Sequence, residues 1–227
     1  MNDNRGNLVP MYVLADESGS MAPHIAELNA GLSSLHAALL GEPMAAAKVR
    51  FSVIGFSHRA TVRLRAADLR RENELPLLKS DGGGTSYRAA FQELLASIPR
   101  DITELKQQGY TVHRPAVFML TDGQPNSRED WTTPHHELTD RGITRAAPNI
   151  IACGIGEDVE AATIVQVATD PDYAFVSIPG TDVGAAIAKF CTALTTSVIE
   201  SGLSLGGDSP ELVVEKPVGF RMAIDVV

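Results

Sequence analysis

The chain has 227 residues and a mass of 24.2 kDa, a size that suits one large domain or one domain with a short appendage. Hydrophobic residues make up 44% and charged residues 21%, and this balance excludes a disordered chain, a collagen-like fibre and a coiled coil. The 28 acidic and 19 basic residues give a net charge of −9, which argues against a nucleic-acid partner because such proteins present a concentrated basic face.

The apolar residues alternate between two patterns along the chain. Short apolar runs, each of a length that suits a strand buried on both faces, cover residues 11–15, 49–56, 116–120, 149–154 and 173–178. Apolar residues that recur every three or four positions predict helices over residues 25–39, 87–98 and 183–198. Residues 60–64 follow a short turn after the second run and predict an antiparallel edge strand.

Strands that alternate with helices of this length are typical of a parallel sheet covered by helices. We therefore predict a doubly wound α/β fold, with a mostly parallel six-stranded sheet, one antiparallel edge strand and helices on both faces. The arginines of that edge, Arg59, Arg63 and Arg65, suit a solvated strand that must not pair with another sheet. A basic partner site there is the alternative.

The composition changes after the last predicted helix, where glycine, serine and proline become frequent. This change predicts one domain over residues 1–200 and an appendage over residues 201–227. In the appendage, residues 212–214 and 222–224 could each form a short strand. Such strands could pair with the edge of the domain, with each other or with a second chain.

The cellular location is predicted from what the sequence does not contain. The first ten residues, MNDNRGNLVP, lack the regions of a signal peptide, and no run of about 18 apolar residues is evident. We therefore expect a cytoplasmic protein without a membrane span. Cys153 and Cys191 each lie in an apolar segment, so we expect two buried, reduced cysteines rather than a disulfide.

Three loops rich in oxygen-bearing side chains are predicted at one edge of the sheet. Residues 16–20 follow the first strand, residues 82–86 precede the helix over 87–98, and residues 121–123 follow the strand over 116–120. In a doubly wound sheet such loops meet at the carboxyl ends of the strands. Together they offer two carboxylates and three hydroxyls, from Asp16, Asp122, Ser18, Ser20 and Thr85.

Each loop taken alone has a structural explanation, because the serines and the threonine suit helix caps and Asp122-Gly123 suits a turn. Their conjunction points to a metal ion. Two carboxylates within about 4 Å repel by roughly 4 kcal/mol at an effective dielectric constant near 20, and a cation removes that cost. Hydroxyl and carboxylate ligands without histidine or cysteine favour Mg²⁺, with Mn²⁺ as the next choice, over zinc.

The three loops resemble the metal-ion-dependent adhesion site of von Willebrand factor A domains. Asp16-x-Ser18-x-Ser20, Thr85 and Asp122 fill all five positions of that motif in the family's order, and the resemblance covers about residues 8 to 200. The residues around these positions are most similar to those of the TerY-type proteins of tellurium-resistance and stress-response systems. Their sequences are Asp-x-Ser-Gly-Ser-Met, Gly-Gly-Gly-Thr-Ser and Leu-Thr-Asp-Gly-x-Pro.

The resemblance implies a role for each residue. Ser18, Ser20 and Thr85 would be direct or nearly direct ligands, whereas Asp16 and Asp122 would act largely through waters. Mostly neutral ligands leave the ion able to accept an Asp or Glu carboxylate from a protein partner. The resemblance further implies partners among kinase-like or phosphatase-like stress-response proteins.

Residues beside the motif are expected to form a rim that contacts the partner. These are Glu17, Gly84, Ser86, Gln124, Asp130 and Trp131. Trp131 is the chain's single tryptophan, which could anchor a partner or pack beneath the loop. Glu17, Asp81, Glu129 and Asp130 would make the rim acidic, and this favours a partner with basic residues around its carboxylate.

A Mg²⁺-dependent phosphoryl hydrolase is the alternative function. A haloacid-dehalogenase-type phosphatase would require Asp-x-Asp after the first strand, but Ser18 stands in place of the second aspartate. No lysine follows the glycines at 82–84 as a phosphate-binding P-loop requires. We therefore expect a binding module and not an enzyme.

Overall fold

The computed structural model describes residues 5–207 and 210–225. Its core is an eight-stranded sheet with the order β3-β2-β1-β5-β6-β7-β8, and β4 pairs with the beginning of β1. The central pairs are parallel, whereas β3 and β8 run antiparallel to their neighbours. The strands are β1 (Asn7–Asp16), β2 (Val49–Phe56), β3 (Ala60–Ala67), β4 (Thr111–Val112), β5 (Ala116–Thr121), β6 (Asn149–Gly154), β7 (Ala174–Ser177) and β8 (Phe220–Met222).

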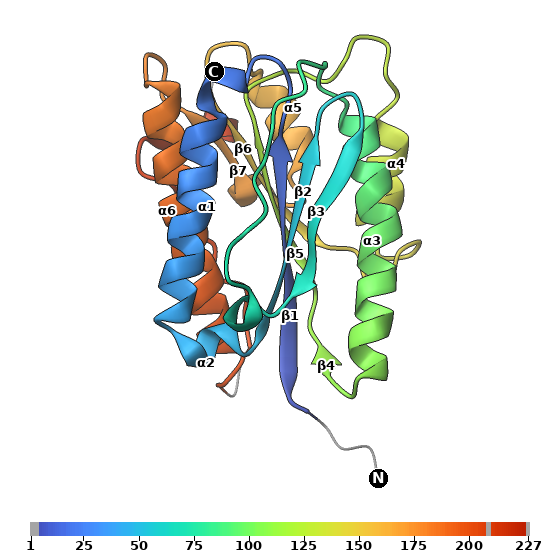
Figure 1. The fold of residues 1–227 in the computed structure, drawn as a ribbon. Coiled ribbons are helices and arrows are strands. Elements are labelled where there is room, and N and C mark those ends of the chain that lie inside the picture. Colours follow the sequence, from blue (N-terminus) through green and yellow to red (C-terminus); the bar gives the residue numbers. More distant parts are fainter. Residues whose placement is uncertain (1–4, 208–209, 226–227) are drawn as a thin grey trace.

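Helices cover both faces of the sheet, as Figure 1 shows. One face is covered by α1 (Ile25–Leu40), α2 (Pro43–Ala46) and α6 (Val183–Ser204). The other is covered by α3 (Tyr87–Gln107), α4 (Thr132–Thr139) and α5 (Ala161–Val167). Short 3₁₀ turns are η1 (Ala22–His24), η2 (Leu69–Arg71), η3 (Pro171–Tyr173) and η4 (Ala223–Asp225).

The central strand β1 shows why the sheet needs helices on both sides. Met11 and Val13 belong to the core beneath α1 and α6, whereas Tyr12 and Leu14 belong to the core beneath α3. Side chains of a strand alternate between the faces of a sheet, so an apolar run must be covered twice. The predicted α/β fold is therefore confirmed.

The sheet has eight strands rather than the predicted six, because β4 and β8 add to it, and β8 overlaps at Met222 with the possible strand over residues 222–224. β4 is two residues long and β8 three, too short for a periodic apolar signal. The predicted antiparallel edge strand is β3, and β8 closes the opposite edge of the sheet by pairing with β7. The arginines of β3 form ion pairs, Arg63 with Glu17 and Arg65 with Asp101 and Glu104.

The segment after α6 returns to the domain. Helix α6 crosses the predicted boundary at residue 200 and ends at Ser204. Leu212 and Val214, which form no strand, pack against the core. Of the pairings left open for the appendage, the structure contains the one with the edge of the domain. The division into residues 1–200 and 201–227 as folding units stays a prediction.

One helix has the length and composition of a membrane-spanning segment, which differs from the expectation that the chain contains none. This is α6, with a mean hydropathy of 1.3 over its most apolar 18-residue window. Core helices have the same properties, and Ile187, Phe190 and Leu194 of α6 are buried in the core of this fold.

Candidate metal centre

The candidate site lies where the order of the strands reverses. The chain proceeds from β1 toward β2 on one side and later from β5 toward β6 on the other. This switch between β1 and β5 leaves a crevice at their carboxyl ends, at the upper end of the sheet in Figure 1. Asp16 is the last residue of β1, and Asp122 follows directly after β5.

Asp16 lies at the base of the site, where its side chain is fully buried. One carboxylate oxygen accepts a hydrogen bond of 2.8 Å from the Ser18 backbone N–H, and the other accepts one of 2.6 Å from the Thr121 hydroxyl. Burial raises the pKa of Asp16 to about 6, although these hydrogen bonds oppose the shift. With both oxygens engaged, Asp16 fixes the loop after β1 to the end of β5.

A chain of side-chain hydrogen bonds continues from this base to the surface. The hydroxyl oxygens of Ser18 and Ser20 are 3.1 Å apart, and the Ser20 hydroxyl donates to Asp122 at 2.8 Å. Ser18 is buried and Ser20 is exposed. Burial is also the main cause that raises the pKa of Asp122. The loops after β1 and β5 are thus joined through the predicted metal-binding side chains.

The third loop brings Thr85 against the loop after β5. The Thr85 backbone N–H donates to the side-chain oxygen of Asn126 at 3.1 Å, and the Asn126 N–H donates to the Thr85 carbonyl at 2.9 Å. Gly123 permits this approach, because a Cβ there would lie 3.1 Å from the Thr85 hydroxyl oxygen. The Gly19 N–H donates to the Gly83 carbonyl at 2.9 Å and joins this loop to the first.

The donor set fits a hard divalent cation. It consists of three neutral hydroxyls and two carboxylates from three loops that contact one another, and oxygen ligands of this kind suit Mg²⁺ or Mn²⁺. Among residues 5–207 and 210–225, no three or more histidine, cysteine, aspartate and glutamate side chains group in a way that could hold a metal ion.

Glu17 is not part of an acidic rim, which corrects the prediction. Its side chain is buried and accepts two hydrogen bonds from Arg63, at 3.2 and 2.8 Å, and one from the Lys79 backbone N–H at 2.9 Å. The carboxylate lies over Gly55, where a Cβ would come within 2.2 Å of it. Glu17 thus stabilises the back of the loop and cannot meet a partner.

Two other rim residues also serve the fold. The Ser86 side chain is buried and caps α3 by accepting a hydrogen bond of 3.1 Å from the Ala89 N–H. Trp131 is buried and packs edge-on against Tyr87, with ring centroids 5.7 Å apart. The tryptophan therefore packs beneath the loop and is not an exposed anchor.

The remaining rim residues lie at or near the surface. Gly84 and Asp130 are exposed, and Asp130 accepts a hydrogen bond of 3.2 Å from the Thr133 N–H at the start of α4. Gln124 is half-buried, and its side-chain oxygen accepts one of 2.8 Å from the Thr163 hydroxyl. Their contact with a partner stays a prediction.

Two residues that support the site were not among the predicted site residues. Thr121 orients Asp16, and Asn126 holds Thr85 from both sides. Thr121 lies next to Asp122 in the third motif loop, so its position could have indicated a role for its hydroxyl in the site. The role of Asn126 depends on a contact across 41 residues of sequence, which no local pattern reveals.

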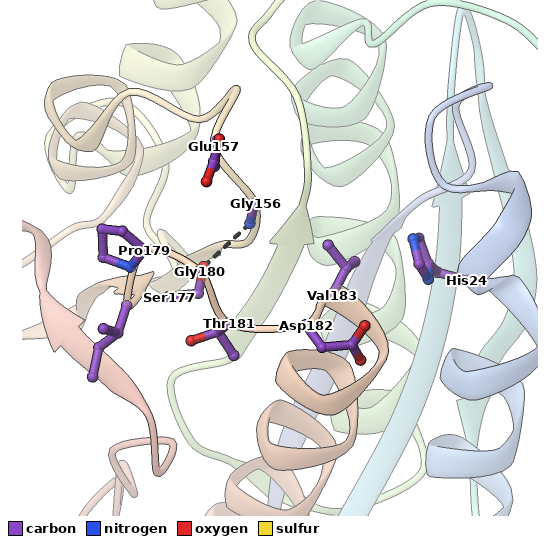
Figure 2. A pocket seen from close by; sticks show the side chains of 10 residues that line it. His24, Gly156, Glu157, Ser177, Pro179, Gly180, Thr181, Asp182 and Val183 are labelled. Atoms are coloured by element: carbon purple, nitrogen blue, oxygen red, sulfur yellow. Dashed lines mark hydrogen bonds between the residues drawn. The ribbon is translucent and has the colours of Figure 1, made fainter.

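A hollow of about 470 Å³ lies along the same edge of the sheet. Figure 2 shows His24 on one side and the loops after β6 and β7 on the other, where Gly156 donates a hydrogen bond to the Ser177 hydroxyl. Glu157 and Asp182 line this hollow. Its His24 is near enough to Asp122 to act on that carboxylate's pKa, so the hollow borders the candidate metal centre.

The fold and these loops define a doubly wound α/β domain with an oxygen-lined site at its switch point. A family model of the von Willebrand factor type A domain matches residues 11–185, and the chain belongs to this family. The family comprises metal-dependent adhesion and protein-interaction modules. A search of curated proteins returned no match.

Solved structures share the fold at low sequence identity. Proximal thread matrix protein 1 from the mussel byssus, with a zinc-occupied metal-ion-dependent adhesion site, is 15% identical with a TM-score of 0.59, over 86% of this chain and 48% of that protein. A von Willebrand factor type A protein from Catenulispora acidiphila is 17% identical with a TM-score of 0.55, over 85% and 43%. The pilus adhesin SpaC from Lactobacillus rhamnosus GG is 13% identical with a TM-score of 0.64, over 87% and 30%. This chain therefore spans less than half the length of these three proteins.

Proposed function

We propose that the chain is a non-catalytic protein-binding module that captures an Asp or Glu of a partner through a Mg²⁺ ion, which Mn²⁺ can replace. The observation that carries this proposal is the hydrogen-bonded series from buried Asp16 through Ser18 and Ser20 to Asp122. The Ser20 hydroxyl in this series is exposed, so an ion held there would face solvent and a partner. The bound ion would supply a positive centre for the partner's carboxylate.

The protein's own residues divide the work by charge. Ser18, Ser20 and Thr85 would hold the ion with neutral oxygens, while Asp16 and Asp122 offset its charge. Neutral ligands weaken the ion's positive charge less than carboxylates do, so an incoming carboxylate is still attracted. Asp16 cannot shift toward the ion without breaking its bonds to Ser18 and Thr121, which supports an indirect role for it.

The hollow beside the site indicates the chemistry that flanks the partner's carboxylate. Glu157 and Asp182 line it, and Asp158 lies near enough to Asp122 to raise that carboxylate's pKa. Like charges across an interface are unfavourable, so a segment with a lysine or arginine beside its metal-binding carboxylate fits best. This assigns the acidic rim to the loop after β6 and the start of α6 rather than to Glu17.

The burial of Asp16 supports binding over hydrolysis. In phosphatases that use an aspartate at the end of the first strand, that carboxylate must reach a phosphorus atom. Asp16 is fully buried and both of its oxygens accept hydrogen bonds, so it is poorly placed to attack. A phosphoester panel with Mg²⁺ tests this point, and turnover that Asp16→Ala abolishes would favour the hydrolase.

The cellular setting is part of the same proposal. The similarity of the three loop sequences to TerY-type proteins supports a cytoplasmic role in a tellurium-resistance or stress-response system, with kinase-like or phosphatase-like partners. Cell fractionation tests the location. Deletion of the gene followed by growth on tellurite tests the system, and unchanged growth would remove this assignment without affecting the metal site.

Asp122→Ala and Asp130→Ala make a matched pair that tests the binding site. Both remove a carboxylate, but only Asp122 accepts the Ser20 hydrogen bond. We expect Asp122→Ala to weaken Mg²⁺ binding at least about tenfold by isothermal titration calorimetry and to abolish magnesium-dependent partner capture. Asp130→Ala should keep the metal affinity. Equal metal affinity in both variants would contradict the proposal.

A further inference from the structure

A second cavity, of about 430 Å³, lies at the opposite end of the sheet from the metal centre. Its walls are the last turns of α3, the linker from β4 to β5 and the linker from α4 to β6. In Figure 1 this region is at the lower end, where β4 lies beside the end of α3. The cavity is therefore separate from the loops that would hold a metal ion.

The cavity is lined by positive charge. Lys106, Arg114 and Arg145 contribute to its wall, and no aspartate or glutamate among residues 5–207 and 210–225 does. Within the described parts of the chain, none of these three cations is ion-paired, whereas Arg63 and Arg65 of β3 are. Burial and the nearby charge of Arg141 both lower the pKa of Arg114. Positive charge is thus gathered here without a carboxylate to offset it, in a chain whose net charge is −9.

A histidine in the same wall has an unused polar atom. His113 Nε2 is buried and has no hydrogen-bond partner within residues 5–207 and 210–225. The backbone of His113 is fixed, because its N–H donates to the Leu8 carbonyl at 2.8 Å. A buried polar atom without a partner is unfavourable and needs an explanation. Because this nitrogen is buried in the wall, we expect an anion in the cavity to change its electrostatic surroundings.

Part of the cavity wall is apolar, and this limits the ligand. Ile102, Val112 and Pro115 line the cavity beside the cations. A volume of this size falls within the range of about 300–1,000 Å³ that small-molecule pockets occupy. Arginines bind phosphate oxygens with two parallel hydrogen bonds, and lysine adds a point charge. We propose that this cavity binds a small organic phosphomonoester, with its phosphate on Arg114, Arg145 and Lys106 and its apolar body against Ile102 and Val112.

Titration calorimetry with three probes tests the chemistry of the ligand. Phenyl phosphate carries both parts, inorganic phosphate carries only the anion, and phenol carries only the ring. We expect phenyl phosphate to bind at least tenfold more tightly than inorganic phosphate and phenol not to bind. Equal affinity for phenyl phosphate and inorganic phosphate would contradict the claim that the ligand has an organic body. No binding of phenyl phosphate at millimolar concentration would contradict the proposed site.

Charge reversal tests the location. Arg145→Glu should weaken phenyl phosphate binding at least tenfold. Arg59→Glu makes the same change of charge at the exposed turn between β2 and β3 and should leave binding unchanged, as should Asp122→Ala at the metal centre. Equal weakening by both arginine variants would show a general charge effect and overturn the site. Circular dichroism verifies that each variant is folded.

The histidine supplies an independent readout. In ¹⁵N spectra of the full chain, saturating phenyl phosphate should shift the Nε2 signal of His113 and leave that of His58 unchanged, because His58 lies at the exposed turn after β2. An unmoved His113 signal in protein that binds the probe would place the ligand elsewhere.

Discussion

The two ends of the sheet treat charge in opposite ways. At the carboxyl end, the buried carboxylates accept hydrogen bonds from within the chain, Asp16 from Ser18 and Thr121 and Glu17 from Arg63. At the amino end, Lys106, Arg114 and Arg145 line a cavity to whose wall the described part of the chain contributes no carboxylate. The difference shows that a net charge is only an average, because the acidic excess of this chain coexists with a locally positive cavity.

The largest expected effect concerns the compensated charge of Glu17. Its side chain is 5% exposed and that of Arg63 28%, so Arg63→Ala would leave a buried carboxylate with only the Lys79 N–H. We expect a loss of about 2–3 kcal/mol in the free energy of unfolding, measured by urea denaturation. Arg59→Ala, at the exposed turn of the same hairpin, should change it by less than about 0.5 kcal/mol. Similar losses in both variants would mean that Glu17 does not depend on its pair.

An effect of similar size is expected from magnesium itself. At about 100 times its dissociation constant, a ligand that binds only the folded state stabilises it by about 2.7 kcal/mol, which for a domain of this size raises the Tm by about 5–10 °C. Asp16→Asn should lose this increment. Without metal it should be at least as stable as the natural chain, since burial already disfavours the charged form of Asp16. Differential scanning calorimetry with magnesium or with chelator measures the increase in Tm. A full increase in Asp16→Asn would contradict the proposed metal site.

Neighbouring residues at the start of α3 separate metal binding from stability. Thr85→Val removes the hydroxyl near Gly123 and keeps the shape, so Mg²⁺ affinity should fall about 10–100-fold with little change in stability. Ser86→Ala removes the helix cap and should cost about 1 kcal/mol, with the metal affinity kept. Calorimetric titration and urea denaturation measure the two effects. The reverse pattern would exchange the roles of these residues.

The smallest stability effect is expected at the amino end. Arg145 is exposed and forms no ion pair among the described residues, so Arg145→Glu should change the free energy of unfolding by less than about 0.5 kcal/mol. A loss above about 1 kcal/mol in the free energy of unfolding would mean that the charge of Arg145 stabilises the fold. The proposed difference in charge compensation between the two ends of the sheet would then be wrong.

Much of the fold follows from the sequence because buried strands and amphipathic helices have periodic patterns. The predicted strands 49–56 and 149–154 match β2 and β6 to the residue. The five motif residues could be brought together in the same way, since strand ends and chain order determine where the loops meet. Glu17 could not be placed, because a charged residue within a motif loop gives no sign of a buried partner 46 residues away. The same limit hid the contact of Asn126 with Thr85.

The strand β8 bears on how the protein behaves at high concentration. It covers the edge of β7 by antiparallel pairing, in which Phe175 lies opposite Met222, Val176 opposite Arg221 and Ser177 opposite Phe220. An uncovered edge is a template on which another chain can add a strand. Removal of the residues after α6 would bare this template beside the buried Phe220 position. We therefore expect β8 to protect the protein from polymerisation. A variant that ends at residue 204 should aggregate while it still binds the metal ion.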